Sequence, residues 1–142
     1  MAKKPSEARM SQDFAVWIWN AYPEWRGLYC LNLNNTGLHL SLKMVASWLP
    51  ERYSFLAEII VSKIEELNRR LAGINKSSGL VAGRADATLY HPTWIVHFEF
   101  KLDNGVQSQA QKDWQKLVEK QGHKYYIIRS VAEGQSIVNN LV

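Results

Sequence analysis

The sequence predicts an α/β fold with the element order α-β-α-β-β-α-β-α. Long segments in which apolar residues recur at helical spacing alternate with short runs of β-branched and aromatic residues, and turn-forming residues bound those runs. Two such runs follow each other with only a short turn between them, which predicts a hairpin. The 142 residues are 46% hydrophobic, so we expect one domain, residues 1–142, with a substantial core.

The first half of the chain supplies two helices and one strand. We expect the first helix from Pro5 to about Tyr22 and a strand from Leu28 to Leu33. A long helix should start at Pro50, with Gly73 as its stop. Its apolar stripe consists of Tyr53, Leu56, Ile60, Ile64, Leu67 and Leu71. Both a helix packed on its own sheet and a dimer seam produce this near-heptad spacing, and we favour the sheet.

The hairpin consists of two expected strands, from Ala85 to Tyr90 and from Trp94 to Lys101. Successive side chains point to opposite faces of a strand. The second strand therefore presents Trp94, Val96, Phe98 and Phe100 to a core, and Ile95, His97, Glu99 and Lys101 to the other face. A four-residue loop from His91 to Trp94 places Asp86 opposite Glu99, whereas a three-residue loop pairs Asp86 with Phe98 unless a bulge restores the register.

A helix, a strand and a short last helix complete the chain. The helix is expected from about Gln109 to Gln121 and the strand from Tyr125 to Arg129. The residues of the helix that should face the core are Ala110, Trp114, Leu117 and Val118. Two capping boxes are predicted, Ser108-x-x-Gln111 before the helix and Ser130-x-x-Glu133 at the start of the last one.

Asp86, Glu99 and Lys101 form the pattern with the clearest chemical meaning. Two adjacent carboxylates raise each other's pKa unless a cation lies between them. Oxygen ligands of this kind suit Mg²⁺ or Mn²⁺, and such an ion next to a lysine ammonium can promote phosphodiester hydrolysis. The alternative is a Glu-x-Lys pair on the solvated face of an antiparallel strand, which is common and structural.

A family resemblance favours the chemical interpretation. The motifs that carry it are Gly83-Arg84-Ala85-Asp86, Phe98-Glu99-Phe100-Lys101, Ser108-Gln109-Ala110-Gln111 with Trp114, Gly122, and Ile127-Ile128-Arg129-Ser130-Val131. In this order they resemble the VRR-NUC (virus-type replication-repair nuclease) family of the PD-(D/E)xK superfamily. The likeness covers the chain from about Gly79 to its C-terminus and the N-terminal part loosely. It implies a restriction-endonuclease-like αβββαβ core, with a mixed sheet flanked by helices, an inserted long helix and a C-terminal helix.

The resemblance also implies roles for individual residues. Asp86, Glu99 and the backbone carbonyl of Phe100 would be metal ligands, and Lys101 would be the catalytic lysine. Gln111 matches the glutamine that supports the site, although its place in a capping box is a sufficient structural explanation. Two further positions match less closely. Glu7, ahead of Asp13, is the best match to the acidic residue on the family's first helix, and Ala85 replaces the usual proline.

The expected activity is that of a Mg²⁺- or Mn²⁺-dependent DNA endonuclease. Compact members of the family resemble Holliday-junction resolvases and act as homodimers on branched DNA. A net charge of +4 and a pI of about 9.2 suit a polyanionic partner. The basic residues that we expect on DNA are Arg84, Lys112, Lys116 and Lys120, and the three lysines form one helix stripe that a solvated face would equally explain. The alternative function is a non-catalytic nucleic-acid-binding module with the nuclease fold.

The remaining expectations concern compartment and the central stretch. Cys30 is the only cysteine, which excludes an intramolecular disulfide and fits a reducing cytosol. No apolar run reaches the roughly 18 residues that span a bilayer, so we expect a soluble protein of the bacterial or phage-infected cytoplasm. Residues 38–78 would shape a DNA groove, build an oligomer interface or complete the core.

Overall fold

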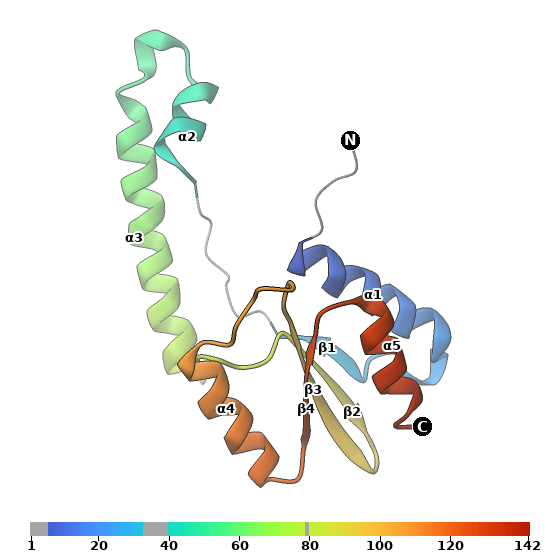
Figure 1. The fold of residues 1–142 in the computed structure, drawn as a ribbon. Helices are drawn as coiled ribbons and strands as arrows, with labels where there is room; N and C mark the ends of the chain where they lie inside the picture. The colour runs from blue at the N-terminus through green and yellow to red at the C-terminus, as the bar shows by residue number, and fades with distance from the viewer. Residues whose placement is uncertain (1–5, 33–39, 79) are drawn as a thin grey trace. The chain divides into compact units, whose positions relative to one another are not determined.

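A four-stranded mixed sheet with helices on both faces forms the first of two units in this protein (Figure 1). The computed structural model describes residues 6–32, 40–78 and 80–142. Residues 1–34 and 82–142 belong to the first unit, and residues 35–81 form the second. The expected helix start at Pro5 and strand end at Leu33 lie outside the described residues.

The sheet has the strand order β1-β2-β3-β4. Its strands are β1 (Tyr29–Leu31), β2 (Ala87–His91), β3 (Trp94–Phe100) and β4 (Lys124–Ile128). The first three strands are antiparallel neighbours, and β4 runs parallel to β3. Parallel neighbours need a crossover connection, and the helix α4 supplies it between β3 and β4. The α/β class and the expected order of strands are confirmed.

Helices α1 (Glu7–Ala21) and α5 (Val131–Asn139) cover one face of the sheet. Phe14 of α1 is fully buried, and its ring lies edge-on to that of Phe98, with 5.2 Å between ring centres. A Cβ on Gly134 would lie 2.6 Å from the Phe14 ring, so only glycine lets α5 approach α1 this closely. The main cluster of buried apolar residues is therefore on this side of the sheet.

Helix α4 (Gln109–Lys120) covers the opposite face. Val118 packs there with Tyr125, and Trp114 is half-buried against them. The expectation that Leu117 faces the core is wrong, because its side chain is 55% exposed. Trp114 and Val118 are four residues apart and occupy one side of α4, whereas Leu117 lies at the margin of that side.

The hairpin register matches the four-residue loop. His91 pairs with Trp94 and Ala87 pairs with Phe98. Continuing this register by one residue would place Asp86 opposite Glu99, and Asp86, which directly precedes β2, accepts a hydrogen bond from the Phe100 N–H. Val96, Phe98 and Phe100 lie in the main core, and Glu99 points to the α4 face. The predicted alternation of side chains along β3 is therefore confirmed.

The second unit consists of α2 (Leu42–Trp48), a 3-10 turn (Glu51–Tyr53) and α3 (Leu56–Ser77). Helix α2 packs against α3, with Val45 and Ala57 buried in this unit. The expected helix bounds are wrong at both ends. Pro50 precedes the 3-10 turn rather than α3, and α3 continues through Gly73 to its C-cap Ser78.

The continuation of α3 has a simple energetic explanation. A glycine inside a helix costs only about 1 kcal/mol relative to alanine, so the rest of a long helix outweighs it. The favoured packing of this helix on the sheet and the alternative dimer seam both remain predictions. Among the described helices, none is sufficiently long and apolar to traverse a lipid bilayer.

Candidate active site

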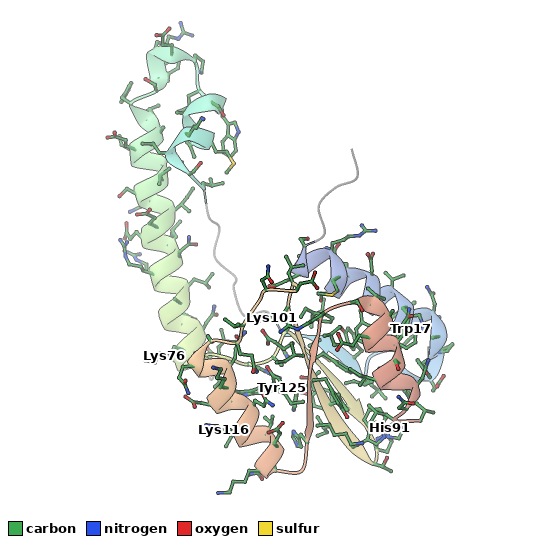
Figure 2. The ribbon with its side chains drawn as sticks, in the orientation of Figure 1. Trp17, Lys76, His91, Lys101, Lys116 and Tyr125 are labelled. Carbon is green, nitrogen blue, oxygen red and sulfur yellow. The ribbon has the colours of Figure 1, made fainter. Side chains whose placement is uncertain are left out.

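Asp86, Glu99 and Lys101 come together at the end of the hairpin. Asp86 immediately precedes β2, Glu99 lies in β3, and Lys101, which is labelled in Figure 2, directly follows β3. The Oδ2 atom of Asp86 accepts a hydrogen bond from the backbone N–H of Phe100 at 2.9 Å. This bond holds the carboxylate across the hairpin, beside the end of the strand that carries Glu99.

Glu99 is a fully buried carboxylate that meets three side-chain donors. Its Oε1 atom accepts from the Lys101 ammonium at 2.8 Å and from the amide of Gln111. Its Oε2 atom accepts from the hydroxyl of Tyr125 at 3.3 Å. The alternative of a solvated Glu-x-Lys pair is therefore wrong, because α4 covers this face of the sheet.

The charges at the site depend on one another. Burial raises the pKa of Glu99 and the charge of Asp86 adds to that rise, whereas the hydrogen bonds from Lys101 and Tyr125 oppose it. Burial by itself lowers the pKa of Lys101, but the hydrogen bond and the charge of Glu99 outweigh burial and leave the pKa raised. Lys101 is thus a charged ammonium at neutral pH, and its ion pair with Glu99 leaves the repulsion between Asp86 and Glu99 in place.

Gln111 makes a contact of each kind that its two explanations call for. Ser108 and Gln111 form the predicted capping box, in which Oε1 of Gln111 accepts from the Ser108 N–H at 2.8 Å. The amide nitrogen of the same side chain donates to Glu99. The capping box is confirmed, and the role of this glutamine in supporting the site stays a prediction.

Gly83 allows the loop before β2 to lie against the first turn of α4. Its φ is 79°, which favours glycine, and a Cβ there would lie 2.2 Å from the carbonyl carbon of Ala110. The contact fixes the distance between the segment that carries Asp86 and the helix that carries Gln111. The motif containing Gly83 thus has a structural reason independent of chemistry.

Sequence reasoning missed Tyr125 and Gln107. Tyr125 is 8% exposed, and the side-chain amide of Gln107 donates to its hydroxyl at 3.3 Å and to Gln115 at 2.9 Å. Since Gln107 donates into the phenol oxygen, the phenol proton points to Glu99. Alternation along the predicted last strand could have put Tyr125 on the same face as Ile127, but the pairing of β4 with β3 was needed to bring it to Glu99.

Glu7 lies near Lys101 but apart from the two other carboxylates. Its Oε1 atom accepts from the backbone N–H of Leu102 at 3.2 Å, and its charge contributes to the raised pKa of Lys101. Asp13, the weaker candidate, pairs instead with Arg9 at 3.0 Å on an exposed part of α1. Within residues 6–32, 40–78 and 80–142, no three His, Cys, Asp or Glu side chains gather as a metal-binding cluster.

The two carboxylates of the site, Asp86 and Glu99, suit a divalent cation that prefers hard oxygen ligands. Asp86 and Glu99 offer two carboxylates from adjacent strands, and their mutual repulsion is what a cation would relieve. Mg²⁺ is typically bound by one or two carboxylates while it keeps several waters, so it does not need a third protein carboxylate. A carboxylate accepts about four hydrogen bonds, and Glu99 uses three of these positions in the described structure.

The basic residues expected on DNA lie on α4 and in the loop before β2. Lys112, Lys116 and Lys120 are all exposed on α4 (Figure 2 labels Lys116). Arg84 is half-buried, with its guanidinium 3.5 Å from the Tyr90 hydroxyl. The exposed lysines form the predicted stripe, and Arg84 belongs to the loop that leads to Asp86.

His97 lies two residues before Glu99 in β3 and is also buried. Its Nδ1 lies 2.9 Å from the Thr88 hydroxyl, and its Nε2 lies 3.0 Å from Nδ1 of His123. Burial, with smaller contributions from the charges of His123 and Arg84, lowers the pKa of His97 to about 4. His97 is therefore a neutral imidazole at pH 7.

Comparison with known proteins does not assign the chain to a family. No protein-family model matches it, and neither the curated proteins nor the solved structures contain a match. A function for the site must follow from the chemistry of its residues.

Proposed function

We propose that this protein is a Mg²⁺- or Mn²⁺-dependent DNA endonuclease of the PD-(D/E)xK type. The observation that carries this proposal is the meeting of Asp86, Glu99, Lys101 and Gln111 at one end of the hairpin, where Glu99 binds both Lys101 and Gln111. Burying a carboxylate is costly even when it is paired and hydrogen-bonded, and far more so when it is not. A second carboxylate beside it adds to that cost, which favours a functional role for the pair.

The order of elements supports a restriction-endonuclease-like αβββαβ core. When the unit of residues 35–81 is set aside, the chain runs α1-β1-β2-β3-α4-β4, with α5 following. The segment that carries Asp86, the strand that carries Glu99 and the helix that carries Gln111 then occupy successive positions of that core. Residues 35–81 would be the insertion.

Each residue would have a separate task in hydrolysis. Asp86, Glu99 and the Phe100 carbonyl would hold the cation, which when bound would activate a water and stabilise charge on the phosphate. Lys101 would place its ammonium against the negative charge that develops as the phosphodiester breaks. Gln111 would keep Glu99 oriented from the helix, because its own amide is fixed by the capping box.

The proposed substrate is DNA, with branched structures cut by a homodimer. The net charge of +4 and the exposed stripe of Lys112, Lys116 and Lys120 support a polyanionic substrate. A resolvase needs two sites to cut opposing strands, so the homodimer is part of the junction proposal. A strictly monomeric active protein would contradict junction resolution while leaving the nuclease proposal intact.

The decisive experiment is cleavage of labelled four-way junction, flap, duplex and single-stranded DNA with Mg²⁺ or Mn²⁺. Wild type is compared with Asp86→Ala, Glu99→Ala and Lys101→Ala, and circular dichroism checks that each variant is folded. Asp113→Ala and Lys63→Ala are matched controls, since both residues lie elsewhere on exposed helix surfaces. We expect cleavage by wild type and the controls only.

The outcomes separate the candidate functions. Paired nicks in the junction support a resolvase, and cleavage mainly of other substrates retains the nuclease without junction selectivity. DNA retention without turnover by folded wild type would favour a non-catalytic binding module. Wild-type turnover in any of the three site variants would reject the role assigned to that residue.

A further inference from the structure

The loop that follows Lys101 is held by a single arginine. Arg129 lies directly after β4, and its Nη1 atom donates to the carbonyls of Leu102 at 2.7 Å and Asp103 at 3.0 Å. Its Nη2 atom donates to the carbonyl of Gly105 at 3.1 Å. One guanidinium therefore binds three backbone carbonyls of one short loop.

The same loop packs against the side chain of Lys101. A Cβ on Gly105 would lie 3.2 Å from both Cβ and Cδ of Lys101, so the loop folds back onto the lysine's aliphatic chain. The Gly105 N–H donates to the Leu102 carbonyl at 2.7 Å, which closes the turn. The turn therefore limits the positions that the Lys101 side chain can adopt.

The backbone around Lys101 is fixed from other elements as well. The Lys101 N–H donates to the carbonyl of Ile128 at 3.0 Å, and the Leu102 N–H donates to Glu7 of α1 at 3.2 Å. Glu133 of α5 accepts from the N–H of Arg129 at 2.7 Å and so fixes the base of the arginine. Arg129 adds its three hydrogen bonds to these backbone contacts.

We propose that Arg129 is a positioning residue for catalysis, an inference that rests on the proposed function. Arg129 holds the 102–105 turn against Lys101 and thereby fixes the lysine ammonium beside Glu99. Arginine suits this role because its planar fork presents several N–H donors in a fixed geometry. A lysine there would keep the positive charge but could not bind the three carbonyls in the same arrangement.

The test compares Arg129→Lys with wild type and with Arg26→Lys. Arg26 is a matched control, because it is also exposed and donates to a backbone carbonyl, that of Trp19, at 3.1 Å. Three quantities are measured: amide hydrogen exchange at Gly105, Mn²⁺ affinity from the electron paramagnetic resonance signal of free Mn²⁺, and the kcat and KM for cleavage of the best DNA substrate.

We expect Arg129→Lys to speed exchange at Gly105 and to lower kcat on the order of 100-fold, because small displacements of a catalytic group carry losses of that size. Mn²⁺ affinity and KM should stay within about twofold of wild type, because Arg129 is proposed to act through Lys101 rather than through the cation or DNA. Added guanidinium should restore part of the kcat of Arg129→Ala. Arg26→Lys should match wild type in every measurement.

Two outcomes would overturn the inference alone. If wild type is active, the first is an unchanged kcat and KM in Arg129→Lys. The second is a raised KM with an unchanged kcat, which would make Arg129 a DNA contact. If wild type neither cleaves DNA nor binds Mn²⁺, the proposed function fails and the catalytic role of Arg129 falls with it. Gly105 exchange then decides only whether the arginine holds the loop.

Discussion

Gln111 donates a hydrogen bond to Glu99 from the first turn of the helix that follows the hairpin. The other end of the same amide accepts from the Ser108 N–H. The two partners determine which side of the amide carries the oxygen, since only the nitrogen can donate to a carboxylate. The start of α4 and the orientation of Glu99 are therefore coupled through one side chain.

This coupling can be separated by two substitutions. Gln111→Glu keeps an oxygen for the Ser108 N–H but replaces the donor to Glu99 with another acceptor. We expect near-normal helix capping and a loss of DNA cleavage of at least about 10-fold, because the added charge disfavours an ionised Glu99. Ser108→Ala should instead lower the free energy of unfolding by about 1 kcal/mol and retain most activity. Urea unfolding and cleavage rates check both, and equal losses of activity would contradict the assignment.

The ion pair between Lys101 and Glu99 predicts a pH-dependent effect on stability. Lys101→Met should lower the free energy of unfolding by about 3 kcal/mol at pH 8, because it leaves a buried carboxylate without its cation. The pKa of Glu99 is already raised by burial and would rise further. A folded-state pKa above the unfolded value favours the folded state at low pH, and this advantage is lost as pH rises through it.

The deficit of Lys101→Met should therefore shrink as the pH falls and Glu99 takes up a proton. Urea unfolding at several pH values measures it, and the double variant Lys101→Met with Glu99→Gln should recover much of the loss. A deficit that does not change with pH would show that lost packing, rather than the charge of Glu99, causes it.

The buried His97 predicts that the protein loses stability as the pH falls, which is the reverse of the effect expected from Glu99. Its pKa falls from the usual 6.5 to about 4 in the folded state, mainly through burial. The unfolded chain then binds the proton more readily, so stability present above pH 6.5 is lost as pH falls towards 4, by about 3 kcal/mol in the limit. His97→Gln should flatten this acid limb in unfolding experiments, whereas His91→Gln should keep it. Parallel acid limbs in wild type and His97→Gln would reject the assignment.

A cation bound by Asp86 and Glu99 should stabilise the folded protein. Mg²⁺ or Mn²⁺ at 100 times its Kd would add about 2.7 kcal/mol if it binds only the folded state. We expect the melting temperature to rise with Mn²⁺ and to return to its starting value with EDTA. Asp86→Asn should abolish the rise and Asp113→Asn should keep it. An equal rise in both variants would place the cation elsewhere.

Local patterns in the sequence account for much of the fold. Alternation over residues 94–101 placed Phe98 and Phe100 in the core and Glu99 on the opposite face, because side-chain direction in a strand depends only on position. The Ser108 capping box was also predictable, since its partners are three residues apart. The end of α3 was not, because a helix of this length outweighs one glycine.

The sequence by itself determined that Glu99 and Lys101 share a face of their strand, whereas the position of Asp86 depended on the length of the hairpin loop. Tertiary structure alone decided that α4 buries Glu99, that β4 brings Tyr125 to its second oxygen and that Arg129 binds the loop beyond Lys101. The contacts of Tyr125 and Arg129 join residues 24 to 27 positions apart in the chain. The physical reason is that local periodicity fixes the direction of a side chain, whereas its partner across the sheet depends on how separate elements pack.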